Sequence, residues 1–95
     1  MIEWTKVEGK NRDHHVAVYT LSTCGWCKKI KRLLENLEIE YHYVDIDLLK
    51  GEEKEEARSE MKKYNPSGSC PTVVVDHGKD HIVGFKEDRV REVLC

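Results

Sequence analysis

The feature that most constrains this chain is a pair of cysteines, Cys24 and Cys27, that two residues separate. Residues 16–21 (VAVYTL) come just before the pair and form a continuous apolar, β-prone run, which is typical of a strand covered on both faces. The segment after the pair has apolar residues at helical spacing: Ile30, Leu33, Leu34 and Leu37. The pattern predicts a buried strand, a turn that carries the cysteines, and a helix that Ser22 or Thr23 caps.

The rest of the chain predicts an alternation of strands and helices. Strands are expected at residues 41–46, 72–75 and 81–83, and a charged helix at residues 50–64. A short C-terminal helix would face inward with three residues: Val90, Val93 and Leu94. The order β-α-β-α-β-β-α predicts an α/β fold with a central mixed four-stranded sheet flanked by helices. Residues 1–14 are an N-terminal extension with an optional strand at 2–7, and residues 15–95 form the domain.

Composition excludes several classes of protein. The chain has 95 residues, 16 Lys and Arg against 18 Asp and Glu, and a formal net charge of −2, so no basic face for nucleic acid is expected. No apolar run approaches the roughly 18 residues that span a bilayer. The polar N-terminus lacks the apolar stretch of a secretory signal, which predicts a cytoplasmic protein, and a monomer is the default expectation.

Four cysteines are present: Cys24, Cys27, Cys70 and Cys95. An even count in a short secreted chain indicates a disulfide scaffold, but in a reducing cytosol it favours redox chemistry or metal binding. Cys70 has two interpretations, a third sulfur beside the active pair or a small hydrophobic residue that packs, and packing is favoured. Cys95 is terminal, and no role is assigned to it.

The position of the close pair at the start of a helix indicates its chemistry. Free N–H groups and the helix dipole favour a thiolate at Cys24, and the neighbouring positive charge of Lys28 would add to this. A thiolate of lowered pKa attacks a disulfide, and the second thiol, Cys27, resolves the mixed intermediate. Farther along, Pro71 opens a strand, where its missing N–H is tolerated.

Three segments together resemble glutaredoxins, members of the thioredoxin-fold superfamily, over residues 15–95. They are VAVYTLSTCGWCKKIKRLLE, CPTVVVD and GFKEDRVREVL. The resemblance implies a thioredoxin fold, with Cys24 as the exposed nucleophile, Cys27 as the resolving thiol and Pro71 as a cis-proline that faces them. The substrate-binding residues are expected to be the following: Thr23, Gly25, Trp26, Cys70, Pro71, Gly84 and Phe85.

The chain also departs from the glutaredoxin pattern. It has Cys-Gly-Trp-Cys where these proteins carry Cys-Pro-Tyr-Cys, and Lys86 stands where an acidic or hydroxyl residue would cap the amine of glutathione. No tightly bound cofactor is expected. Glutathione or another low-molecular-weight thiol is the expected reductant, with a thioredoxin-reductase-type enzyme as an alternative electron donor and disulfide-containing proteins as partners.

Two functions follow from these observations. The first is a thiol-disulfide oxidoreductase that reduces protein or low-molecular-weight mixed disulfides. The alternative is a carrier of a [2Fe–2S] cluster held between two subunits, with Cys24 of each subunit and two glutathione thiols as ligands and Cys70 as a further thiolate. A structural zinc site is disfavoured because the chain lacks a complete Cys/His quartet, so no metal site is expected.

Overall fold

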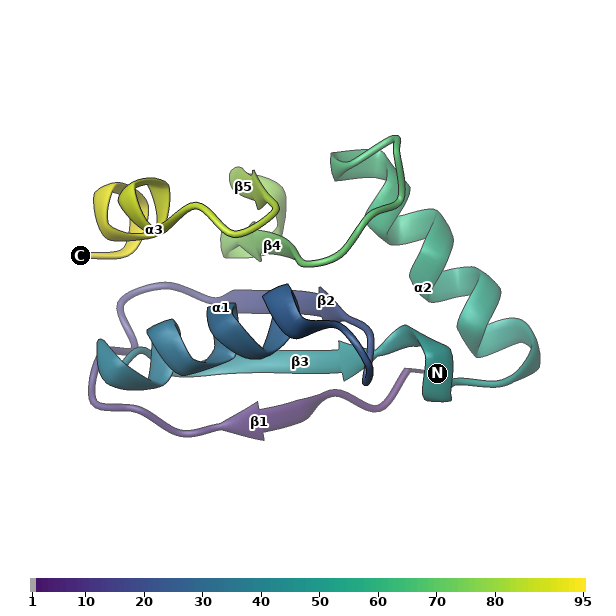
Figure 1. Ribbon diagram of the computed structural model, residues 1–95, viewed down its shortest axis with the longest axis horizontal. Coiled ribbons are helices and arrows are strands. Elements are labelled where there is room, and N and C mark those ends of the chain that lie inside the picture. The colour runs from purple at the N-terminus through teal and green to yellow at the C-terminus, as the bar shows by residue number, and fades with distance from the viewer. Residues whose placement is uncertain (1) are drawn as a thin grey trace.

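The computed structural model describes residues 2–95, and a five-stranded mixed sheet forms its centre (Figure 1). The strands are β1 (Thr5–Val7), β2 (Val16–Thr20), β3 (Tyr41–Asp45), β4 (Thr72–Val75) and β5 (Asp80–Val83). They lie in the order β1-β3-β2-β4-β5. β2 and β3 are parallel, as expected for strands joined by a crossover helix, and β4 and β5 form the predicted antiparallel hairpin.

Three helices cover this sheet: α1 (Gly25–Asn36), α2 (Gly51–Tyr64) and α3 (Glu87–Leu94). The apolar stripe of α1 packs with α3 against one face, where Val18, Ile30 and Val90 are fully buried. α2 packs against the other face through its two buried apolar residues, Ala57 and Met61. Because strand residues alternate between faces, each apolar strand serves both layers, and β2 and β4 are buried along their whole length.

The α/β thioredoxin-type arrangement is therefore confirmed, with small differences at its edges. The strand predicted at 41–46 ends at Asp45, its pairing with β2 stops there, and Ile46 begins a 3-10 turn, η1 (Ile46–Leu48). β1 adds a fifth strand by pairing antiparallel with β3, so the N-terminal segment belongs to the sheet. Among residues 2–95, no helix combines the length and apolar character that crossing a membrane requires.

Candidate active site

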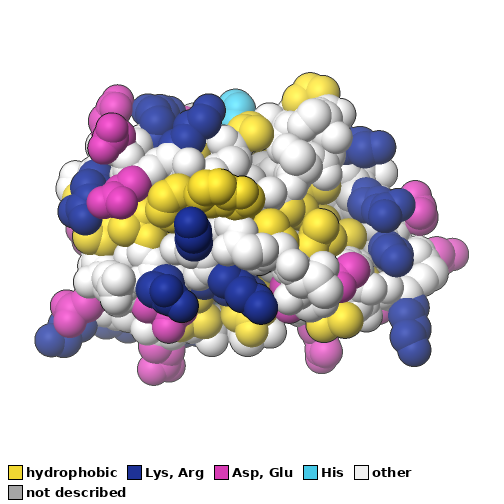
Figure 2. Space-filling model, viewed as in Figure 1, with side chains coloured by type: hydrophobic (Ala, Val, Ile, Leu, Met, Phe, Trp, Pro, Cys, Tyr) yellow, Lys and Arg dark blue, Asp and Glu magenta, His cyan; other side chains and the backbone are white. Residues whose placement is uncertain are grey.

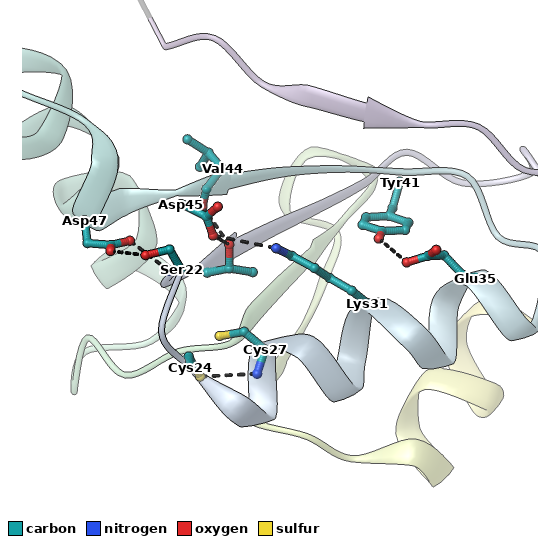
Figure 3. A network of polar contacts seen from close by, with 10 residues as sticks. Ser22, Cys24, Cys27, Lys31, Glu35, Tyr41, Val44, Asp45 and Asp47 are labelled. Carbon is teal, nitrogen blue, oxygen red and sulfur yellow. Dashed lines mark hydrogen bonds and ion pairs between the residues drawn. The ribbon is translucent and has the colours of Figure 1, made fainter.

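Cys24 and Cys27 lie where β2 passes into α1 (Figure 3). Cys24 itself is the N-cap, and its sulfur accepts a hydrogen bond from the backbone N–H of Cys27 at 3.2 Å. The prediction that Ser22 or Thr23 caps the helix is therefore wrong. Ser22 instead donates from its backbone N–H to Asp47 at 2.9 Å, which ties the loop before Cys24 to η1, while Thr23 is exposed.

The two thiols of the pair differ in exposure. Cys24 is half-buried, while the side chain of Cys27 has no exposed surface and belongs to the core. All four cysteines are free thiols. One thiol of the pair can therefore meet a substrate, and the other lies behind it.

The pKa of Cys24 differs from the expectation. Burial and the neighbouring Cys27 thiol raise the pKa of Cys24, while the backbone N–H groups of Cys27 and Trp26 lower it, and the balance lies above the ordinary value. Lys28 is exposed and is not among the main groups that shift the pKa of Cys24. The expected depression of the thiol pKa at the helix start is thus offset by the removal of water from around the sulfur.

Cys70 joins the pair from the start of β4. Interaction between the Cys70 and Cys27 thiols raises the pKa of Cys27 and lowers the pKa of Cys70. The Cys24 sulfur lies 3.9 Å from the backbone oxygen of Cys70, and the Cys70 sulfur lies 3.8 Å from the Met61 sulfur. The structure therefore places three sulfur groups together, and Cys70 both packs on the core and contacts the redox pair.

Pro71 and Gly84 lie side by side next to Cys70. The peptide bond between Cys70 and Pro71 is cis, in agreement with the glutaredoxin resemblance. The backbone N–H of Gly84, which has a positive φ of 82°, donates to the Pro71 oxygen at 2.8 Å and so holds the end of β5 beside the proline. Glycine suits this position because other L-residues rarely adopt such a backbone.

Trp26 and Phe85 form the outer border of the cysteine site. The Trp26 side chain is 57% exposed, and its ring centroid lies 5.8 Å from that of Phe85. The Lys29 ammonium lies 4.4 Å from the Trp26 centroid, which keeps positive charge over the exposed indole. Gly25, between the cysteine and the indole, has open space where a side chain would lie. Figure 2 shows hydrophobic side chains in a band across the middle of this view, with Lys and Arg around them.

A groove of about 320 Å³ opens on the other side of Cys70, between that residue and α2. Its charged lining residues are Asp47, Lys54, Arg58 and Lys62. The three cations, Lys54, Arg58 and Lys62, all come from the charged helix α2. A larger cavity of about 450 Å³ lies elsewhere on the α2 side, between aromatic residues and histidines, and no cysteine lines it.

A polar network behind the cysteines was not evident in the sequence. The buried Thr20 hydroxyl donates to the Asp45 carboxylate at 2.6 Å. The Lys31 ammonium from α1 points toward the same carboxylate and lies 3.6 Å from it (Figure 3). These contacts tie the ends of β2 and β3 to the helix that carries Cys24. The residues are far apart in sequence, so no local pattern would have predicted the network.

Metal binding within one chain finds no support in the geometry. Among residues 2–95, no group of three or more His, Cys, Asp or Glu side chains is arranged to hold a metal ion. This holds for Cys24, Cys27 and Cys70 as well.

Comparison with known proteins agrees with this geometry. The sequence model of the Glutaredoxin family matches residues 16–82. Glutaredoxin 1 from Rickettsia prowazekii (strain Madrid E) is 30% identical over 86 residues, which are 85% of this chain and 87% of that protein. The crystal structure of the glutaredoxin from Methanosarcina mazei Go1 has a TM-score of 0.89 at 44% identity, and the match covers 98% of this chain and 88% of that one.

A further match is 41% identical over 58 residues to a probable maleylacetoacetate isomerase from Caenorhabditis elegans, and it covers only 24% of that longer protein. The full-length matches, the cis-proline and the cysteine pair at the start of α1 agree with one another. The chain belongs to the glutaredoxin family, whose members are thioredoxin-fold thiol-disulfide oxidoreductases.

Proposed function

We propose that this protein reduces disulfides by dithiol exchange through Cys24 and Cys27. The Cys24 thiolate attacks a substrate disulfide, so a mixed disulfide forms and one substrate thiolate leaves. Cys27 then attacks the Cys24 sulfur, the second substrate thiolate leaves, and the protein holds the Cys24–Cys27 disulfide. The observation that carries this proposal is the difference in exposure, since Cys24 is half-buried and the Cys27 side chain is fully buried directly behind it.

The residues around Cys24 support roles in holding the substrate. The exposed Trp26 and its neighbour Phe85 would contact the apolar part of a disulfide-bearing substrate. Pro71 and Gly84 would border its backbone, and the open space at Gly25 and the exposed Thr23 leave the approach to Cys24 clear.

The reductant is proposed to be a low-molecular-weight thiol that carries carboxylates, with glutathione as one member of this class. Support comes from the groove beside Cys70, where Lys54, Arg58 and Lys62 outnumber the single carboxylate of Asp47. Such an excess of cations raises the local concentration of anionic ligands. A thioredoxin-reductase-type enzyme remains the other proposed electron donor. A reducing compartment such as the cytoplasm suits a protein whose cysteines work as free thiols.

The test is turnover of a protein disulfide, measured for three single variants. Cys24→Ser is expected to reduce turnover at least about a hundredfold, because the attacking sulfur is lost. Cys27→Ser is expected to accumulate a mixed disulfide that mass spectrometry maps to Cys24. Cys95→Ser, which removes an exposed thiol outside the site, is the matched control and should behave as the parent protein. Full turnover by Cys24→Ser would overturn the proposal.

A further inference from the structure

The Cys70 thiol contacts the redox pair on one side and a different surface on the other. The Cys24 sulfur lies 3.9 Å from the backbone oxygen of Cys70, and the Cys27 and Cys70 thiols shift each other's pKa, so Cys70 belongs to the same cluster as the redox pair. On its other side the Cys70 sulfur lies 3.8 Å from Met61 of α2, and the residue is half-buried rather than sealed in the core. Cys70 is therefore a partly accessible sulfur that shares its neighbour, Cys27, with Cys24.

The surface that Cys70 faces is charged. Cys70 lines the groove of about 320 Å³ beside α2, whereas Cys24 and Cys27 do not line it. The charged residues of that groove are three cations and one carboxylate: Lys54, Arg58, Lys62 and Asp47. Figure 2 shows dark-blue Lys and Arg side chains, with Asp and Glu among them, at the end of the molecule where α2 lies. An anionic molecule small enough for this groove would meet the Cys70 sulfur before it met Cys24.

We propose that Cys70 is a second entry thiol, which takes small carboxylate-bearing disulfides from this groove and shares Cys27 with Cys24 as the resolving thiol. The Cys70 thiolate, whose proton has gone to solvent, attacks a disulfide RSSR; a Cys70–SR bond forms, the S–S bond breaks and RS⁻ leaves. Cys27 then attacks the Cys70 sulfur, a Cys27–Cys70 disulfide forms, and the second RS⁻ takes up a proton. The substrate gains two electrons and becomes two thiols, while the protein loses two electrons.

The electrostatics of the cluster support this order of events. Interaction with the Cys27 thiol favours a thiolate at Cys70 and lowers its pKa, while the pKa of Cys27 is raised, so Cys70 loses its proton before Cys27 does. Reduction of the Cys27–Cys70 disulfide for a further cycle uses the reductant named above. The inference therefore rests on the proposed function for turnover, but its first half-reaction stands alone.

The decisive experiment traps the entry thiols in Cys27→Ser, whose hydroxyl still donates a hydrogen bond but cannot resolve a mixed disulfide. The reduced variant is treated with dithiodiglycolate, a small dicarboxylate disulfide, and the adducts are mapped by mass spectrometry. Adducts on both Cys24 and Cys70 are expected. Adducts on Cys24 alone would overturn the second entry thiol and leave the proposed function intact, and adducts on Cys70 alone would overturn Cys24 as the general entry thiol. Adducts on neither would overturn both proposals.

A second experiment examines resolution by Cys27. Cys24→Ser treated with dithiodiglycolate is expected to form a Cys27–Cys70 disulfide, identified as a linked peptide under non-reducing conditions. Cys24→Ser/Cys70→Ser is the matched control and should show no intramolecular link. If Cys24→Ser keeps its native circular dichroism spectrum and forms only a stable Cys70 adduct, the shared role of Cys27 is refuted.

The choice of an anionic substrate has its own test. The rate of Cys70 modification in Cys24→Ser is compared between dithiodiglycolate and the neutral 2-hydroxyethyl disulfide, each relative to free cysteine. Arg58→Gln is expected to lower the preference for the anion about threefold, because one groove cation is lost. Lys63→Gln removes a cation of the same helix that does not line the groove and should change the preference little. An unchanged preference in Arg58→Gln would refute the role of the groove.

Discussion

At neutral pH the Cys24 thiol of the free protein is expected to be less ionised than an ordinary cysteine. A thiol with the usual pKa of about 8.5 is about 3% thiolate at pH 7. Burial raises the pKa of Cys24 above its ordinary value, so its thiolate fraction at pH 7 is smaller still. Each unit of pKa reduces that fraction tenfold, but it also makes the thiolate a better nucleophile, so the net loss in rate is about threefold per unit.

The assay is pulse alkylation of the reduced protein with iodoacetamide between pH 6 and pH 11, with the modified cysteines mapped by mass spectrometry. The midpoint of the Cys24 profile is expected to lie above that of a short unstructured peptide with one cysteine, and the Cys70 profile should reach its midpoint at lower pH than the Cys24 profile. The peptide is the control because its cysteine has the ordinary peptide pKa and no folded environment.

One result would refute this reasoning. If alkylation of Cys24 has already reached its plateau at pH 7, the backbone N–H groups of Cys27 and Trp26 outweigh burial at this sulfur. The expectation drawn from the helix start alone would then hold, and desolvation would be a minor effect at this site.

Two further predictions concern stability, both measured by urea unfolding. Gly9→Ala should destabilise the protein by about 1–3 kcal/mol, because a Cβ there would lie 2.6 Å from the Glu38 carbonyl oxygen. Gly25→Ala is the control, since its Cβ would meet no atom within 4 Å, and it should not destabilise the protein. Burial and the 3.0 Å hydrogen bond to Glu35 raise the pKa of Tyr41. The contribution of this phenol to the free energy of unfolding is therefore complete below its unfolded pKa of about 10 and is lost at higher pH. Tyr41→Phe should thus be less stable than the parent protein at pH 7, and it should lose less stability than the parent between pH 7 and pH 11. Equal losses for the two glycine variants, or an unchanged alkaline slope in Tyr41→Phe, would contradict these arguments.

Much of the fold was predictable because its elements carry strong local patterns. The continuous apolar runs of β2 and β4 and the helical stripe of α1 each specify one type of element. β1 is different, since three residues with two exposed side chains give almost no periodicity, and its place depends on pairing with β3. Local sequence cannot report such a partner.

Only part of the site was predictable, because the two segments that form it are brought together by strand pairing. β4 runs antiparallel to β2 with Tyr19 opposite Thr72, so the start of β4 lies beside the end of β2. Cys70 and Pro71 therefore come close to Cys24 without any local signal in either segment. The cap at Cys24 was missed because Ser22 bonds to Asp47, a residue 25 positions away.

The histidines show the same limit of sequence reasoning. His15 stacks on His77 at 4.1 Å and on His42 at 5.1 Å between ring centroids, although the three are scattered along the chain. Adjacent strands and the turn after β4 bring them together, so only the tertiary structure reveals the group.

The two proposed entry thiols, Cys24 and Cys70, both depend on the buried Cys27 to resolve their mixed disulfides. Because Cys27 is fully buried, it reaches substrate only through a sulfur that already carries a mixed disulfide, Cys24 or Cys70. Cys24 lies beside the exposed Trp26, which suits a protein surface, whereas Cys70 faces a groove that suits a small anion. A buried resolving thiol would thus allow two substrates of different size to deliver oxidising equivalents to one protein, and the two single variants, Cys24→Ser and Cys70→Ser, should separate them.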